Sequence, residues 1–181
     1  MAALFARWGA TIIDADAIVR ELQQPGHDVF KAIVATFGRK VLRADGAIDR
    51  AALRTRVLAD SDARAQLESI VHPAVEARRD ELFRAAQARG DSVVVVEMPL
   101  LFEATDPAVY DGIIVVDAPL AERRRRLMQD RNLPGDVADA LIAAQWPAER
   151  KRALATWTID NDANRAVLEM RARAVWQEIN H

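Results

Sequence analysis

The sequence predicts an α/β protein with a mostly parallel sheet. Short segments rich in β-branched residues alternate with longer segments of helical periodicity, as expected when strands are joined by helices. Two of the short segments, residues 93–96 and 113–116, are continuously apolar, which is typical of strands covered on both faces. The chain has 181 residues, of which 51% are hydrophobic, enough to form the core of a single domain.

Four strands are predicted, each ending at an acidic residue. They cover residues 10–14, 92–97, 112–117 and 157–160. A weaker strand signal lies at Lys40-Val41-Leu42. Apart from that signal, residues 17–90 show only helical patterns, so we expect a helical lobe inserted between the first two strands.

Turn and capping residues set the predicted helix ends. Asp49 follows an Asp45-Gly46 turn and is predicted to cap a helix over residues 50–59. Gly90 is predicted to end a helix, and His72-Pro73 is predicted to separate two helices within the lobe. Further helices are predicted after Pro119, after Pro134 and over residues 163–179, and residues 119–155 form a second helical excursion.

Composition excludes several classes of protein. The chain has no cysteine, which excludes disulfides, thiolate metal sites and a cysteine nucleophile, and predicts a reducing cytoplasm. The apolar runs are too short to cross a bilayer, and we expect no secretory signal. A net charge of -2 and the lack of interleaved basic and aromatic residues argue against nucleic-acid binding.

Acidic residues follow every predicted strand. They are Asp14, Asp16, Glu97, Asp117 and Asp160. In open parallel sheets the ligand binds beyond this edge, where carboxylates hold Mg²⁺ or accept a proton. The alternative is that these acids only cap the helices that follow. Asp14-Ala15-Asp16 is the stronger functional candidate, because both acids follow one strand directly.

Arginine supplies most of the positive charge and forms one run, Arg123-Arg124-Arg125-Arg126. On a helix, four successive side chains point around most of the circumference, so they do not all face one ligand. Two interpretations remain open. In the first, the four arginines form a solvated helix face, with Arg123 or Arg126 folded over the core. In the second, some of these arginines bind a polyphosphate.

An ordered set of short motifs gives a family resemblance. The motifs are Ile12-Ile13-Asp14-Ala15-Asp16, Pro25-Gly26, His72-Pro73, Pro99-Leu100-Leu101-Phe102-Glu103, Gln145-Trp146-Pro147 and Ile159-Asp160-Asn161. Together they span nearly the whole chain, which resembles the dephospho-CoA kinase family. The resemblance implies a P-loop nucleotide-kinase-like parallel sheet flanked by helices, with a helical CoA lobe at about 17–90 and a lid at about 119–155. It also implies transfer of the ATP γ-phosphate to the 3′-hydroxyl of dephospho-CoA, with Mg²⁺, by a monomer or small homo-oligomer.

Site residues are carried over from the family to matching positions only. By the resemblance, Asp16 is the catalytic acid that accepts the hydroxyl proton. The dephospho-CoA pocket is expected to include Arg20, His72, Pro99, Leu100, Leu101, Phe102 and Glu103. The nucleotide and lid residues are expected to be Arg126, Arg131, Lys151 and Asn161. The family usually has Arg before Asp in the lid, but this chain has Asp130-Arg131, which leaves open which arginine reaches the phosphates.

The glycine-rich phosphate loop of the family, G-x-x-x-x-G-K-[ST], does not occur in these residues. That loop cradles the phosphates with backbone N–H groups, and its Ser or Thr holds Mg²⁺. We therefore expect a truncated chain that lacks the first strand and has little turnover, with its metal ligands unknown. Two alternatives remain, a non-catalytic remnant that binds dephospho-CoA or a partner chain, and another small-molecule kinase.

Overall fold

A computed structural model describes residues 1–180, with the side chain of Ala104 left out. The chain divides into two compact units. One consists of Ala10–Met98, and the other of Met1–Gly9 together with Pro99–His181. Each unit contains a two-stranded parallel sheet, so the predicted α/β class is confirmed.

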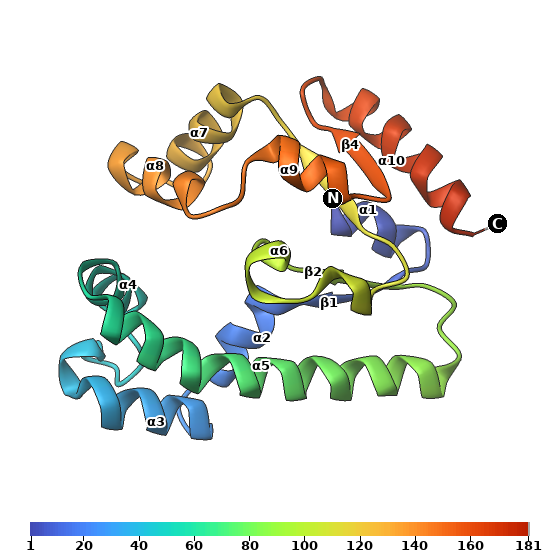
Figure 1. The fold of residues 1–181 in the computed structure, drawn as a ribbon. Helices are drawn as coiled ribbons and strands as arrows, with labels where there is room; N and C mark the ends of the chain where they lie inside the picture. Colours follow the sequence, from blue (N-terminus) through green and yellow to red (C-terminus); the bar gives the residue numbers. More distant parts are fainter. Residues whose placement is uncertain (181) are drawn as a thin grey trace. The chain divides into compact units, whose positions relative to one another are not determined.

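In the unit Ala10–Met98, helices fill the chain between the two strands (Figure 1). Strand β1 (Thr11–Asp14) pairs in parallel with β2 (Val94–Glu97), and Asp14 is the register partner of Glu97. The helices are α2 (Ala15–Leu22), α3 (Asp28–Phe37), the 3₁₀ turn η1 (Arg39–Val41), α4 (Arg50–Ala59) and α5 (Ser61–Arg89). Both strands lie where the sequence predicted them, one or two residues shorter.

Aspartate side chains cap the N-termini of three of these helices. Asp14 accepts the Ala17 N–H at 2.9 Å, and Asp49 accepts the N–H groups of Ala51 and Ala52 at 3.0 Å. Asp60 accepts the N–H groups of Asp62 and Ala63 at the start of α5. Each cap satisfies backbone donors that have no partner within the helix. The predicted cap at Asp49 and the predicted helix end at Gly90, where φ is +77°, are confirmed.

Two sequence predictions in this unit are wrong. His72-Pro73 does not separate two helices, because α5 runs through Pro73 for 29 residues. The proline removes one backbone hydrogen bond, but α5 packs against α2, α3 and α4, and that burial outweighs the local cost. Lys40-Val41-Leu42 is not a strand either, since it forms η1 and a single antiparallel bridge between Leu42 and Ile48.

The core of this unit lies between the helices of the lobe. Its buried members are Val29, Ile33, Val41, Ile48, Leu53 and Val71. They come from α3, η1, α4, α5 and the loop before α4, so the lobe has an apolar interior of its own.

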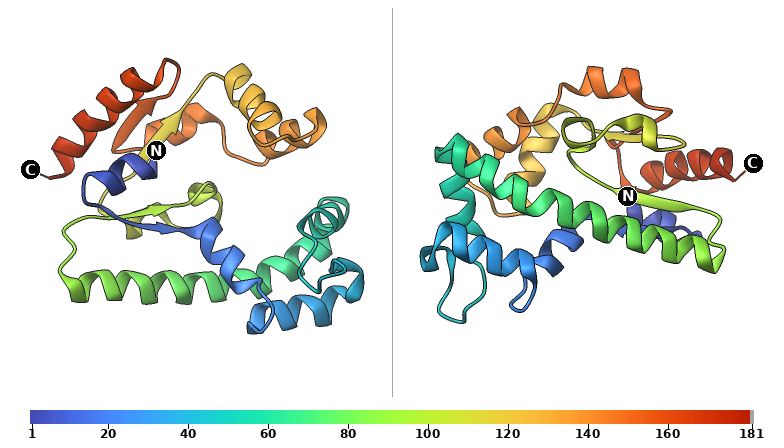
Figure 2. Two further views of the ribbon diagram at one scale, coloured as in Figure 1. Left: turned by 180° about the vertical axis from the view of Figure 1, so that it is seen from behind. Right: turned by 60° about the horizontal axis from the view of Figure 1, so that its bottom comes forward.

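The other unit holds the second pair of strands. Strand β3 (Ile114–Asp117) pairs in parallel with β4 (Trp157–Asp160), and both match the predicted segments. Its helices are α1 (Ala2–Arg7), α6 (Leu101–Ala104), the 3₁₀ turn η2 (Pro107–Val109), α7 (Leu120–Gln129), α8 (Gly135–Ala143), α9 (Ala148–Leu154) and α10 (Arg165–Ile179). Helix α10 packs along β4, as the left view of Figure 2 shows.

Aromatic side chains join α1 to α10. Phe5 is 1% exposed, and its ring lies 5.7 Å from the Trp8 ring and 5.8 Å from the Trp176 ring. The edge-to-face angles, 66° and 69°, are those that aromatic quadrupoles favour. Helix α1 is therefore held by its apolar side, although it has no side-chain cap. No helix within residues 1–180 combines the length and hydropathy of a membrane-spanning segment.

Candidate functional site

Both carboxylate oxygens of Asp14, at the end of β1, accept hydrogen bonds. Oδ1 accepts the Ala17 N–H at 2.9 Å, and Oδ2 accepts from Arg20 Nη2 at 3.1 Å. Asp14 therefore begins α2 and also restrains Arg20, the first of the predicted substrate residues. The capping interpretation of the sequence holds for this acid.

Asp16, two residues further on, is different. It lies exposed in the first turn of α2, and within residues 1–180 its carboxylate has no hydrogen bond or ion pair. A charged carboxylate with free oxygens is chemically suited to accept a proton from a hydroxyl group.

The other strand-end acids of the first and second sheets are not equivalent to Asp16. Glu97 ends β2 and is exposed. Asp117 and Asp160 are register partners on β3 and β4, and Arg152 Nη1 donates to both, at 3.3 Å and 2.5 Å. Asp117 also accepts the Ala118 N–H at 2.8 Å. The sequence analysis did not select Arg152, because nothing in the local sequence distinguishes it from Arg150, two residues earlier.

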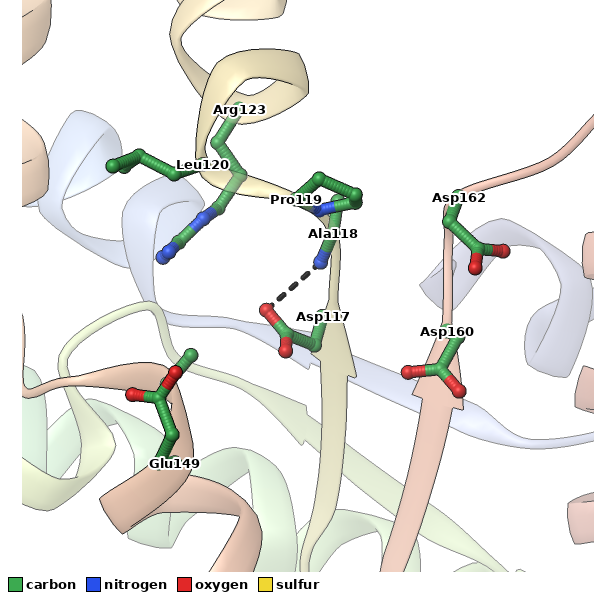
Figure 3. A pocket seen from close by; sticks show the side chains of 9 residues that line it. Asp117, Ala118, Pro119, Leu120, Arg123, Glu149, Asp160 and Asp162 are labelled. Atoms are coloured by element: carbon green, nitrogen blue, oxygen red, sulfur yellow. Dashed lines mark hydrogen bonds between the residues drawn. The ribbon is translucent and has the colours of Figure 1, made fainter.

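A cavity of about 270 Å³ lies at the carboxyl ends of β3 and β4 (Figure 3). Its ionisable lining residues are Asp117, Arg123, Glu149, Asp160 and Asp162. In Figure 3 the Arg123 side chain extends from α7 toward the side of Glu149, and Asp160 and Asp162 line the other side. This is the edge at which open parallel sheets bind ligands.

The four consecutive arginines of α7 have different partners. Arg124 Nε donates to Asp139 at 2.7 Å, and Arg125 Nη2 donates to Glu122 at 2.6 Å. Hydrogen bonds from Arg125 and then Arg126 hold the pKa of Glu122 at about 2. Arg124 and Arg125 are thus surface ion pairs, as the solvated-face interpretation predicted.

Arg126 and Arg123 point to other groups. Arg126 Nη2 donates to the Asn161 carbonyl at 3.1 Å, which brings together two of the predicted nucleotide residues. Arg123 lines the cavity, and its Nε is buried without a hydrogen-bond partner among the described residues. Arg123 was not among the predicted nucleotide residues, although the arginine run contained it. Arg131 is exposed, and within residues 1–180 it forms no ion pair.

Lys151 is half-buried on α9. Its Nζ donates to Gln145 Oε1 at 2.8 Å. Burial lowers the pKa of Lys151, and Arg123 lowers it further, while the carboxylates of Glu103 and Asp117 act in the opposite direction. The charged amine therefore lacks a direct carboxylate partner in the described part of the chain, and an added anion would stabilise it.

The predicted substrate stretch from Pro99 to Glu103 has mixed surroundings. Phe102 is buried and stacks on Trp146, with ring centroids 5.9 Å apart, while Glu103 Oε1 accepts the Trp146 N–H at 2.5 Å. Glu103 Oε2 is buried without a partner among the described residues. Pro99 and Leu100 are exposed, Leu101 is half-buried, and His72, on α5, is exposed.

Over the part of the chain that the structure describes, no group of three or more His, Cys, Asp or Glu side chains is placed to hold a metal ion. The predicted Mg²⁺ therefore has no assigned ligand.

Comparison with known proteins decides the family. Residues 1–166 match the family model of dephospho-CoA kinase. The chain is 45% identical over 161 residues to the dephospho-CoA kinase of Anaeromyxobacter dehalogenans, covering 76% of that protein. This chain belongs to the dephospho-CoA kinase family. The family resemblance predicted from the sequence is thereby confirmed.

A further relative and two solved structures are also similar to this chain. The enzyme of Mycolicibacterium paratuberculosis is 42% identical over 178 residues, and the chain spans only 43% of that longer protein. Among solved structures, TT1252 from Thermus thermophilus is 33% identical with a TM-score of 0.81, and the match covers 98% of this chain and 88% of that one. The dephospho-CoA kinase of Campylobacter jejuni is 26% identical with a TM-score of 0.70, covering 98% and 89%.

Proposed function

We propose that this chain transfers the γ-phosphate of ATP to the 3′-hydroxyl of dephospho-CoA. The observation that carries the proposal is Asp16, a strand-end carboxylate in a member of this family whose oxygens the fold leaves free. The neighbouring Asp14 is fully engaged, so the two acids of the Asp14-Ala15-Asp16 motif have separate roles.

In the proposed reaction, Asp16 orients the 3′-hydroxyl and accepts its proton. The hydroxyl oxygen then forms a bond to the γ-phosphorus as the bond from that phosphorus to the β–γ bridging oxygen breaks, and ADP leaves. The Asp14–Arg20 pair supports this arrangement, because a restrained guanidinium four residues from Asp16 can contact the phosphates of the acceptor.

On the ATP side, we propose that Arg123, Lys151 and the Arg126–Asn161 pair contact the nucleotide. Arg123 and Lys151 support this role because their positive charges lack carboxylate contacts in the described part of the chain. Arg131 is a further candidate, since its side chain is free in solvent.

The test is CoA formation from ATP and dephospho-CoA, with Asp16→Asn as the variant. We expect the substitution to lower kcat by ~10²–10⁴, the range of a general base. Asp62→Asn is the matched control, because Asp62 is the second residue of α5 as Asp16 is of α2, and it is also exposed. An unchanged kcat in Asp16→Asn would remove Asp16 from this role.

The assay has two arms, because the printed residues contain no glycine-rich phosphate loop. One arm uses the 181 residues, and the other uses the chain extended by any residues that are encoded in frame upstream. We expect little turnover in the first arm, because the loop whose backbone amides cradle the phosphates is not among these residues. If neither arm forms CoA, the proposed function is wrong.

A further inference from the structure

Glu103, on helix α6, contacts the segment that leads into α9. Its Oε1 accepts the Trp146 N–H at 2.5 Å, and the two residues lie 43 apart in the sequence. The neighbouring Phe102 stacks on the Trp146 ring, and the Arg150 guanidinium lies 3.4 Å from the centre of that ring. Two adjacent residues of α6 and one of α9 therefore meet at Trp146, one through its backbone and two through its ring.

Helix α9 depends on such contacts for its position. It has only 7 residues, and Pro147 precedes it without a side-chain cap. A helix of this length is not stable by itself, so packing and tertiary hydrogen bonds must fix where it begins. Helix α9 carries Lys151 and Arg152, and Arg152 bridges the acids that end β3 and β4. The contact at Trp146 therefore helps to set where both of these cations lie.

Glu103 also acts on the charge of Lys151. The charged groups around this amine come from three elements, Glu103 from α6, Asp117 from β3 and Arg123 from α7. Burial and the guanidinium of α7 lower the pKa of Lys151, whereas Glu103 raises it, more strongly than the carboxylate of β3 does. Lys151 Nζ donates to Gln145 and not to Glu103, so the carboxylate acts on the amine through space.

The negative charge of Glu103 is not needed for its hydrogen bond to Trp146, because an amide oxygen would accept the same N–H. The second carboxylate oxygen, Oε2, is buried and has no hydrogen-bond partner among the described residues. Burying a charged oxygen without a partner is unfavourable, so the charged side chain costs stability. A nearby positive charge offsets that cost, and the half-buried amine of Lys151 provides one.

We propose that Glu103 is a positioning residue of the nucleotide site, which fixes the start of α9 through Trp146 and faces the amine of Lys151 with a compensating charge. The inference rests on the proposed function, because Lys151 is taken there to contact the nucleotide. From the family resemblance, Glu103 is instead expected to contact dephospho-CoA. The groups on which Glu103 acts in the structure belong to α9 and the segment before it.

The first experiment measures the protonation of Lys151 directly. The chain has three lysines, Lys31, Lys40 and Lys151, so NMR of ¹³C-labelled lysine resolves each one, with the two exposed lysines as internal references. Glu103→Gln keeps an acceptor for the Trp146 N–H but removes the charge. We expect Lys151 to titrate at lower pH in this variant than in the unmodified chain, because the charged amine loses the carboxylate that favours it.

A second variant, Glu103→Leu, removes the hydrogen-bond acceptor as well as the charge. We expect hydrogen exchange of the Trp146 amide to be ~10-fold faster in this variant than in the unmodified chain. In Glu103→Gln the same amide should keep its protection, because the contact is retained. Glu169→Gln, at a carboxylate of α10 that pairs with Arg7, is the matched control and should change neither this exchange nor the Lys151 titration.

ATP binding relates these results to the proposed function. Calorimetry from neutral to alkaline pH, on both forms of the chain used above, should show that Glu103→Gln loses ATP affinity at lower pH than the unmodified chain. If neither form binds ATP, the nucleotide role proposed for Lys151 is wrong and the inference fails with it. If ATP binds but Lys151 titrates alike in Glu103→Gln and the unmodified chain, or the Trp146 amide exchanges equally in all variants, the inference alone is overturned.

Discussion

Acidic and basic side chains at the strand ends differ in how many of their polar atoms the fold already uses. Asp14, Asp117 and Asp160 are hydrogen-bonded to helix amides or to arginines. Asp16 has no such partner among residues 1–180, and Arg123 Nε is buried with none. Residue type alone does not separate these groups. Their hydrogen-bond partners do, and the groups left without partners are the ones that a substrate can engage.

Lys151 provides a test at this scale. We expect Lys151→Met to weaken ATP binding ~10-fold or more, because charge-assisted hydrogen bonds to phosphate are lost. Stability should not fall at neutral pH. The lowered pKa means that folding disfavours the charged amine, and this cost is present below the folded-state pKa and disappears as pH rises past the unfolded value of 10.5.

Calorimetry with ATP and thermal unfolding check this expectation. Lys40→Met is the matched control, since Lys40 is an exposed lysine of η1. Equal ATP affinity in Lys151→Met and the unmodified chain would place Lys151 outside the nucleotide site.

At the scale of elements, one close approach holds β4 against the segment that leads into β3. A Cβ built on Gly112 would lie 2.4 Å from Trp157 Cζ3. The Trp157 ring cannot move away freely, because its Nε1 donates to Glu178 of α10 at 2.7 Å. A side chain at residue 112 would therefore disturb the packing of β3, β4 and α10 together.

We predict that Gly112→Ala destabilises the chain by ~1–3 kcal/mol, the usual cost of forcing extra volume into packed structure. Urea denaturation is the measurement. Gly135→Ala is the control, because there the added Cβ meets the flexible end of Arg124, at 2.9 Å, and the position begins helix α8. Trp157→Leu should reduce the effect of Gly112→Ala. A loss of the same size in both backgrounds would contradict the packing explanation.

At the scale of the whole molecule, many carboxylates titrate below their usual range. The pKa is lowered for Asp28, Asp45, Asp60, Asp91, Glu122, Asp139 and Asp162. The causes are hydrogen bonds from basic side chains, from backbone amides of turns and helix starts and, for Asp91, first from the Thr11 hydroxyl. These acids are exposed or partly exposed, so each ionised carboxylate adds only modestly to the stability of the fold. All of them act on stability in the same direction.

Acid titration should therefore destabilise the chain. A carboxylate with a lowered folded-state pKa stabilises the fold above its unfolded pKa, and that stabilisation is lost as pH falls through the folded value. For Glu122 the window extends from 4.5 to about 2. We expect the melting temperature to fall steadily in this range, and Glu122→Gln to differ from the unmodified chain at pH 7 but not at the acid end. A melting temperature that rises on acidification would contradict this.

Much of the secondary structure could be predicted because it depends on local chemistry. The four strands are short β-branched runs, and Asp49 and Gly90 satisfy helix ends by contacts within a few residues. The helix through Pro73 could not be predicted in this way. Its continuity depends on packing against α2, α3 and α4, which are distant in the sequence.

The motifs in the chain were sufficient to identify its family and to select Asp16, because an ordered set of residue types is a property of the chain itself. They could not show that Asp14 is engaged while Asp16 is free, or that Arg123 and not Arg124 lines a cavity. Those differences depend on which polar atoms meet after folding. Burial and hydrogen-bond partners are set by segments far apart in the sequence, so they exist only in the folded chain.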